Sequence, residues 1–414
     1  MDSKVASGVT PVVAATQAYE RWLHKHVVVV ESDLKLKHQY MKDSLFAFLR
    51  ATFYRWAALW QETCPELADA PRLLAVGDLH VENFGTWRDT EGRLIWGVND
   101  FDEVARMPYA IDLVRLVTSA MFAKRENGLS IDDSAAATAV LQGYSESVAS
   151  GGKAFVLEEN HPDLRAMALG AERDPVKYWG KLVSLASAEP PKRVQRLLNA
   201  WLPDGAAETL FYSRIAGVGS LGRPRYVGIA QCNGGLAARE AKAWLPSAWG
   251  WANGRPKDHA FAVRLLKRSV RDRDPFYLLK DGWVIRRLGP HCGRIELSQF
   301  PKHRDEKAIL KAMGQETANL HLATSDQCAK VLRDLGQRKP DWLQQAASAM
   351  AEATEQDWKS FRSAGEGALR EVQQSPQNTP WKPIAIVLAV VLVVVLICAA
   401  LVVAGVMDLG FSLF

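Results

Sequence analysis

The stretch from Gly77 to Glu103 constrains this chain more than any other, because it places polar residues at the ends of two apolar runs. Those runs occupy residues 73–76 and 94–98, and turn-forming residues lie between them. Short apolar runs bounded by turn residues predict buried strands. Groups set where strands end stand on a rigid scaffold, which is where binding and catalytic residues concentrate. We therefore expect this stretch to form a ligand-binding site.

Three polar residues of the stretch have the pattern of a metal–phosphate site. Asp78 is suited to accept the proton of an attacking hydroxyl. Asn83 and Asp100 carry the oxygen ligands that Mg²⁺ prefers, and phosphate-bound Mg²⁺ needs few protein ligands. The alternative is a purely structural role, in which these residues only form turns, as Asp and Asn often do. Because the set falls at two adjacent strand ends, we favour function for the set.

The composition is that of a folded protein and excludes some classes. The chain has 414 residues, 48% hydrophobic and 23% charged, which suffices for two domains or one large bilobal one. A net charge of +5 is mild for this length and argues against a dedicated nucleic-acid binder. The five cysteines are scattered without CxxC spacing, which argues against a disulfide framework and a zinc site.

The C-terminal region differs from the rest of the chain. Residues 384–407 form an uncharged run rich in Val, Leu and Ile, long enough to cross a bilayer. Lys382 precedes the run and Asp408 follows it, so the positive-inside rule leaves the large domain in the cytoplasm. We predict a single-pass, tail-anchored membrane protein whose helix, residues 383–407, contacts the lipid bilayer through residues 384–407.

A second motif, later in the chain, fits GxGxxG. It comprises Gly217, Gly219, Ser220 and Gly222, and an apolar run at residues 226–230 follows it. A dinucleotide-binding fold would instead open a helix after the glycines. The order therefore favours a glycine-rich flap over phosphates between antiparallel strands.

The string GDLHVENF resembles the catalytic loop of aminoglycoside-phosphotransferase-like and other protein-kinase-like enzymes, and VNDFDE resembles their metal-binding motif. The set most closely resembles the uncharacterised bacterial family called domain of unknown function 2252, in pieces over residues 35–325, most strongly at 76–116. The resemblance implies a catalytic base, two Mg²⁺ ligands, a further candidate ligand, an orienting histidine and an Asp that braces the loop. These are, in that order, Asp78, Asn83 with Asp100, Asp102, His80 and Asp112.

One departure from that resemblance concerns the lysine that pairs with phosphates. The family has Lys-Glu-Ala on a strand after the glycines, whereas this chain has Arg239 at the lysine position and Lys242 three residues later. Arginine and lysine are not interchangeable at a phosphate site. Either Arg239 or Lys242 takes the role, or nucleotide binding is weakened.

The glycine motif follows the catalytic loop here, the reverse of the usual kinase order. We therefore predict an α+β, bilobal, protein-kinase-like fold that is circularly permuted and ends in a transmembrane helix. The predicted parts are a helical segment (1–65), a catalytic-loop and helical lobe (66–205), a small β lobe (206–300), C-terminal helices (301–371), a linker (372–382) and the membrane helix (383–407).

The expected function is phosphoryl transfer from ATP, with Mg²⁺, to an acceptor that the sequence does not identify. A nucleotidyl transferase would use the same site. An inactive nucleotide-binding scaffold is favoured by Arg239. A metal-dependent hydrolase is a further alternative, because Asp78, His80 and Glu82 alternate and would share one face of an extended strand.

Overall fold

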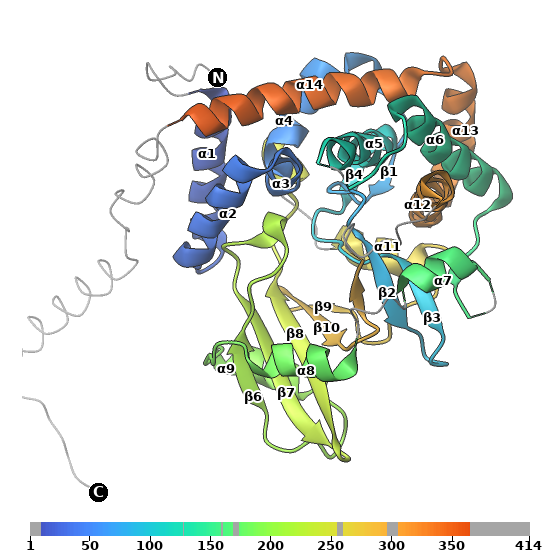
Figure 1. Ribbon diagram of the computed structural model, residues 1–414. Coiled ribbons are helices and arrows are strands. Elements are labelled where there is room, and N and C mark those ends of the chain that lie inside the picture. Colours follow the sequence, from blue (N-terminus) through green and yellow to red (C-terminus); the bar gives the residue numbers. More distant parts are fainter. Residues whose placement is uncertain are drawn as a thin grey trace, which may run out of the picture. The chain divides into compact units, whose positions relative to one another are not determined.

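Helices surround three antiparallel sheets in the described part of this computed structural model (Figure 1). The structure describes residues 10–364 except 127, 159, 169–173, 255–259 and 296–304. These described residues belong to one compact unit.

The smallest sheet positions the first half of the site. Strand β1 (Arg72–Ala75) pairs antiparallel with β4 (Ala105–Pro108), and Leu73 lies opposite Met107. Three of the four residues of β1 are buried, as its apolar sequence predicts. The chain segment after β1 therefore starts from a fixed point in the core.

The second sheet combines strands from distant parts of the sequence. Its order is β11-β2-β3-β5, with β2 (Phe84–Arg88), β3 (Leu94–Val98), β5 (Phe155–Val156) and β11 (Gly293–Arg294). Strands β2 and β3 form the hairpin that the sequence predicts. The carboxylate of Asp89 accepts hydrogen bonds from two backbone N–H groups of the turn, which fixes it.

The third sheet lies in the second half of the chain and carries the glycine motif at one end. Its order is β6-β7-β8-β10-β9, and all pairs are antiparallel. The strands are β6 (Leu210–Ser213), β7 (Arg225–Cys232), β8 (Gly235–Ala243), β9 (Leu278–Lys280) and β10 (Trp283–Leu288).

Two helices cover this sheet (Figure 1). Leu182 of α8 (Pro175–Val183) packs in a cluster with Val227, whereas Val194 of α9 (Lys192–Asn199) packs in another with Ile285. Side chains alternate between the faces of a strand, so the two clusters draw on alternating residues of the sheet.

The main core is helical. Its largest helices are α5 (Ala110–Arg125), α6 (Asp133–Ser150), α12 (Glu306–His321) and α14 (Trp342–Ser363). Helices α6 and α12 approach through two glycines: a Cβ on Gly143 would lie 2.0 Å from the Lys311 carbonyl, and one on Gly314 would lie 2.1 Å from that of Val140. Larger residues at either glycine would force these helices apart.

The N-terminal helices also join this core. Trp358 of α14 donates its indole N–H to the Met41 carbonyl at 3.1 Å, and Arg55 pairs with Asp357 at 2.6 Å. The N-terminal helices are α1 (Pro11–His26), α2 (Glu31–Asp43), α3 (Leu45–Ala51), α4 (Phe53–Thr63) and the short η1 (Pro65–Leu67). The remaining elements are α7 (Pro162–Ala168), η3 (Val218–Ser220), α10 (Ala248–Ala252), α11 (Ala260–Arg268), η5 (Leu322–Gln327) and α13 (Cys328–Gln337).

The fold class predicted from the sequence is wrong. The prediction was a bilobal, circularly permuted kinase-like fold with one small sheet lobe and a terminal membrane helix. The structure is instead a mixed α/β arrangement with antiparallel sheets in both halves. Strand β11, which follows the five-stranded sheet in sequence, completes the sheet of β2. The prediction missed this pairing because a two-residue strand gives no periodic signal.

Within the described residues, no helix combines the length and apolar character needed to cross a membrane. The predicted span, residues 383–407, lies outside the described residues.

Candidate functional site

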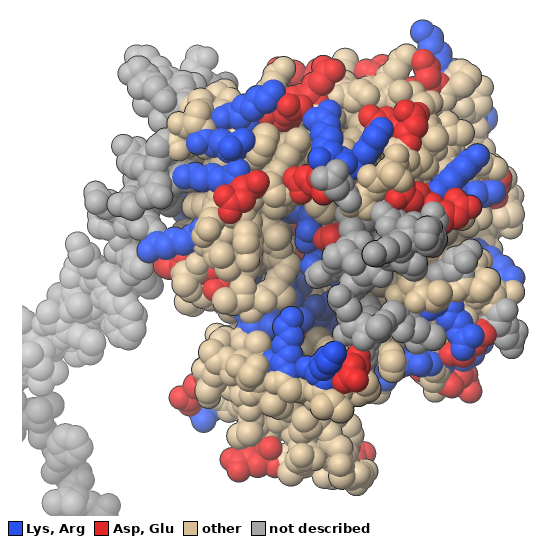
Figure 2. Space-filling view, in the orientation of Figure 1, with Lys and Arg blue, Asp and Glu red and all other residues tan. Residues whose placement is uncertain are grey.

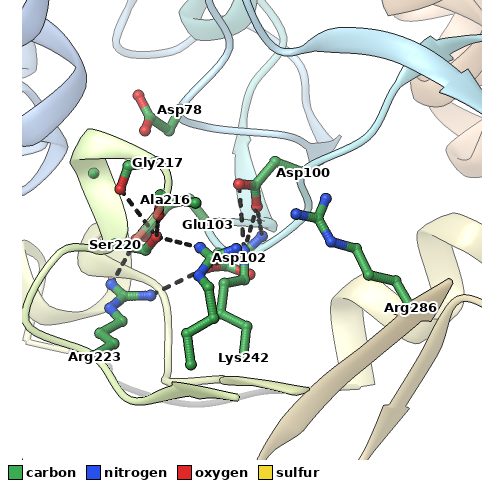
Figure 3. A network of polar contacts seen from close by, with 12 residues as sticks. Asp78, Asp100, Asp102, Glu103, Ala216, Gly217, Ser220, Arg223, Lys242 and Arg286 are labelled. Carbon is green, nitrogen blue, oxygen red and sulfur yellow. Dashed lines mark hydrogen bonds and ion pairs between the residues drawn. The ribbon is translucent and has the colours of Figure 1, made fainter. Parts of the chain in front are cut away.

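The two halves of the predicted site meet at one pocket. It is lined from the first half by Asp78, Asn83 and Asp100, and from the second by Gly217, Gly219 and Ser220. Figure 3 shows Asp78 and Asp100 beside the turn that carries Gly217 and Ser220. We call residues 76–83 the carboxylate loop and residues 217–222 the glycine loop. The structure thus brings together residues more than a hundred positions apart in sequence.

The carboxylate loop is anchored by Asp112 of α5. This fully buried carboxylate accepts hydrogen bonds from the backbone N–H groups of Val76 and Gly77, each at 2.7 Å. His321 also contacts it at 3.0 Å. A carboxylate that satisfies two backbone donors fixes the backbone immediately before Asp78. Asp112 thus lies where a brace for the loop would lie.

Asp78 is oriented by Arg115, one turn further along α5. Arg115 is fully buried and donates two hydrogen bonds, from Nε and Nη2, to the same oxygen, Oδ1, of Asp78. Its guanidinium lies 5.0 Å from the ring centroid of Phe53 and 4.9 Å from that of Trp56, so its own position is fixed. Burial raises the pKa of Asp78, and the charge of Arg115 opposes that rise.

His80 and Asn83 complete the carboxylate loop. The Asn83 side-chain N–H₂ donates to the Asp78 carbonyl, which ties the two ends of the loop together. His80 is buried, and its Nδ1 accepts from the Glu82 backbone N–H at 3.2 Å. Burial, followed by the charges of Arg50, Arg294 and Arg115, holds the pKa of His80 well below its usual value. A neutral imidazole in this setting suits a role in loop structure.

Asp100 and Asp102 share one cation, Lys242 of β8. The Lys242 ammonium lies 3.1 Å from Oδ1 of Asp100 and 2.8 Å from Oδ2 of Asp102 (Figure 3). Although burial acts in the opposite direction, Lys242 and then Arg286 lower the pKa of Asp100 to about 2. Burial and the neighbouring Asp100 raise the pKa of Asp102. The side chain of Asp100 is 41% exposed, whereas that of Asp102 is 8% exposed.

Arg239 lies on the other face of β8 from Lys242, because residues three apart on a strand point to opposite faces. Its guanidinium packs 4.4 Å from the Phe276 ring centroid and donates to the Ala238 carbonyl. Of the two cations that the sequence left open, Lys242 is therefore the one that reaches the carboxylates. The alternation of side chains along a strand separates Lys242 from Arg239, but the sequence alone does not say which of the two faces points towards the carboxylates.

The glycine loop joins β6 to β7 and approaches the carboxylate loop closely. A Cβ on Gly219 would lie 2.8 Å from the Arg50 carbonyl and 3.5 Å from Oδ2 of Asp78. Gly217 and Gly222 have φ values of +73° and +92°, which favour glycine. The Ser220 hydroxyl accepts from Arg225 at 2.7 Å, so it is held towards the strand that follows.

Several residues of the pocket escaped the sequence analysis. Arg223 pairs with Asp102 at 3.3 Å and with Glu103 at 3.4 Å, and it donates to the Tyr19 hydroxyl. Lys37 and Arg50, from the N-terminal helices, line the same pocket. Arg115, which contacts Asp78 from outside the pocket lining, is the one that a sequence signal would have found, because it follows Asp112 by three residues and so shares a helix face with it.

The extended strand invoked for a metal-dependent hydrolase is absent from residues 78–83, which form a turn. Glu82 there pairs with Arg50 at 2.6 Å. The described residues also contain no group of three or more His, Cys, Asp or Glu side chains arranged to hold a metal ion.

An ion shared with phosphates places smaller demands on the protein, and three observations fit it. Asp100 is partly open to the pocket. The Asn83 nitrogen is engaged by the Asp78 carbonyl, which leaves the amide oxygen as its ligand atom. Oδ1 of Asp102 is buried and has no hydrogen-bond partner among the described residues. Such an orphaned oxygen is rare unless a ligand or water satisfies it.

The carboxylate half of the site falls within a known family match. A model of the family described as "Uncharacterized protein conserved in bacteria (DUF2252)" matches residues 29–196. The matched range includes the carboxylate loop, Asp100 and Asp112, and it ends before the glycine loop. No curated protein and no solved structure matches this chain.

Proposed function

We propose that this protein is a phosphotransferase with kinase-like chemistry that takes ATP and Mg²⁺ and phosphorylates a hydroxyl-bearing acceptor. The observation that carries the proposal is that Asp78, Asp100 and the glycine loop line one pocket, with Lys242 paired to Asp100. Phosphoryl transfer asks a protein for a base, for charge neutralisation and for positioning. The residues at this pocket are suited to all three.

Asp78 is the base of the proposed reaction. Because Arg115 occupies Oδ1, the other oxygen, Oδ2, is available to take the acceptor's proton. The acceptor oxygen forms a bond to the terminal phosphorus of ATP, and the bond from that phosphorus to the bridging oxygen breaks. ADP leaves with the electron pair, and the proton passes to Asp78.

Mg²⁺ would be held by Asn83 and Asp100, with Asp102 beside them. When bound, Mg²⁺ would neutralise part of the negative charge of the phosphates. Lys242 now occupies the space in front of Asp100, and in the proposed complex its ammonium turns from the carboxylates to phosphate oxygens. On the face drawn in Figure 2, Lys and Arg side chains gather around a hollow, a distribution that suits an anionic ligand.

The size of the pocket indicates which part of the nucleotide site is formed. Its volume is about 50 Å³, which is room for one or two water molecules or a phosphate group. A whole nucleotide is far larger. The proposal therefore requires the glycine loop to move outward when ATP binds, and none of the residues of η3 in that loop is buried.

Lys242 also bears on the inactive-scaffold alternative. That alternative was favoured by Arg239 at the expected lysine position. Because Lys242 supplies an ammonium beside Asp100, the Arg239 departure no longer argues against activity.

The test is Mg²⁺-dependent ATP binding and ADP release by the purified full-length protein, with water as acceptor. Asp78→Asn keeps an acceptor for Arg115 and removes the base, so turnover should fall by roughly 10²- to 10⁴-fold with nucleotide affinity retained. Asp100→Ala should weaken Mg²⁺–ATP binding as well as turnover. Asp326→Ala, at an exposed carboxylate, is the matched control and should change neither.

Two results would contradict the proposal. Wild-type protein that binds neither ATP nor ADP would exclude a nucleotide site here. Unchanged affinity and turnover in Asp100→Ala would remove the metal role assigned to that carboxylate.

A further inference from the structure

Lys37 of α2 is a buried cation that the proposed mechanism has not used. Its ammonium lines the pocket and donates to the Gly219 carbonyl at 3.2 Å. That carbonyl is its only hydrogen-bond partner among the described residues, and no described carboxylate forms an ion pair with it. An ammonium has three donors, so two remain unused.

A buried charge without a counter-charge is costly, and proteins tolerate it mainly where a ligand supplies the opposite charge. Burial, followed by the charge of Arg223, lowers the pKa of Lys37 to about 8. The charges of Glu20, Asp78 and Glu103 act in the opposite direction. The environment of Lys37 is therefore one that an anion would stabilise.

The position of Lys37 identifies which anion it would meet. A Cβ on Gly219, its partner, would lie 3.5 Å from Oδ2 of Asp78, so Lys37 is bonded to the part of the glycine loop that lies against the base. Lys242 lies instead beside Asp100 and Asp102. The two lysines therefore approach the pocket from different elements, one beside the base and one beside the metal-ligand carboxylates.

We propose that Lys37 is a second phosphate-binding lysine, which contacts the terminal phosphoryl group of ATP, the group that is transferred. This inference rests on the proposed function. It assigns a catalytic contact to helix α2. Lys242 would then contact the phosphates that lie nearer Asp100 and Asp102. A cation on the transferred group stabilises its charge in the transition state.

The experiment compares ATP and ADP, each with Mg²⁺, because they differ only in that phosphoryl group. Titration calorimetry of the full-length protein should show that Lys37→Gln, which retains a donor but loses the charge, weakens ATP by roughly 10-fold or more. ADP affinity should change by less than about 2-fold. Lys37→Arg should restore most of the ATP affinity. Lys35→Gln, at an exposed lysine of the same helix, is the matched control and should leave both affinities unchanged.

The outcomes separate the two proposals. If wild-type protein binds neither nucleotide, the proposed function fails. If wild-type protein binds ATP and Lys37→Gln weakens ATP and ADP equally, or weakens neither, the assignment of Lys37 is overturned while the proposed function stands.

A measurement on the wild-type protein covers the case in which Lys37→Gln does not fold. As pH rises from 7 to 9.5, Lys37 loses its charge, so the preference for ATP over ADP should decline. The other groups facing Lys37 are Glu20 of α1, Asp78, Glu103 and Arg223, and carboxylates and guanidinium groups do not titrate in this range. A constant preference would contradict the assignment.

Discussion

The two loops that meet at the pocket are held in different ways. The carboxylate loop is tied down by Asp112 and Arg115, two fully buried side chains of α5. The glycine loop has no buried residue in its 3₁₀ turn, and Ile215, just before it, is 61% exposed. Hydrogen bonds hold it: Lys37 donates to the Gly219 carbonyl, Arg225 to the Ser220 hydroxyl, and the Val30 N–H to the Gly222 carbonyl.

We infer that the two loops have different roles: the carboxylate loop positions groups, and the glycine loop moves. Rigid placement of the proposed base and metal ligands is what positioning catalysis requires. The pocket has a volume of about 50 Å³, so the glycine loop must move before a nucleotide can enter.

The largest expected effect is a loss of stability in Asp112→Ala, which tests whether Asp112 anchors the carboxylate loop. Asp112→Ala removes the acceptor of two backbone hydrogen bonds and the partner of His321. Breaking a buried, hydrogen-bonded charge typically costs about 3–5 kcal/mol, and we expect a loss of that size in the free energy of unfolding measured in urea.

Asp132→Ala is the control for this change, because Asp132 is an exposed Asp that caps the next helix, α6. Loss of such a cap costs about 1 kcal/mol. Equal effects of the two substitutions would mean that Asp112 does not anchor the carboxylate loop.

Two glycines compare the loops directly. A Cβ would lie 2.7 Å from the Glu103 carbonyl at Gly77 and 2.8 Å from the Arg50 carbonyl at Gly219. Gly77 also has a φ of +88° and sits beside the Asp112 anchor. We expect Gly77→Ala to cost about 3 kcal/mol, from left-handed strain plus overpacking. Gly219→Ala should cost about 1 kcal/mol, because its loop can shift.

Urea unfolding of the two alanine variants measures both costs. Equal losses near 3 kcal/mol would show that the glycine loop is as tightly held as the carboxylate loop, and the proposed opening for ATP would lose its basis.

A third prediction separates the two cations of β8. Lys242→Met removes the ammonium beside Asp100, and a hydrogen bond between charged groups contributes about 2 kcal/mol, so ATP affinity should fall roughly 30-fold. Arg239→Met, on the other face of the strand against Phe276, should change ATP affinity by less than about 2-fold. Titration of both variants with Mg²⁺–ATP provides the comparison. A larger loss in Arg239→Met would assign the phosphate contact to the arginine.

The sequence predicted the local parts of the site and missed the contacts that join them. The hairpin of β2 and β3 follows from two apolar runs and Asp89, because turn chemistry is local. The pairing of β11 with β2 spans about two hundred residues and left no pattern to read. The predicted fold class failed for that reason.

Single side chains show the same difference between roles that the sequence predicted and roles that it missed. Asp112 was assigned through a resemblance, and the structure places it where a brace would lie. Lys37 gave no signal, because a lysine on an N-terminal helix is ordinarily a solvated residue. Its contact with Gly219 depends on how that helix packs, and local sequence does not encode it.

The smallest expected effect concerns His80 and tests whether water enters the carboxylate loop. Burial holds the pKa of His80 below the unfolded value of about 6.5, so below that pH the unfolded state binds a proton that the folded state excludes. Stability attributable to His80 is therefore lost as pH falls, by about 1.4 kcal/mol at pH 5.5. His80→Gln keeps an acceptor for the Glu82 N–H and has no proton to gain. Between pH 7.5 and 5.5, urea unfolding of wild-type protein should therefore lose about 1.4 kcal/mol more than the variant does. Identical losses would mean that His80 takes up its proton in the folded state. A carboxylate loop that admits a proton so readily would be open to solvent, and the contrast with the glycine loop would then disappear.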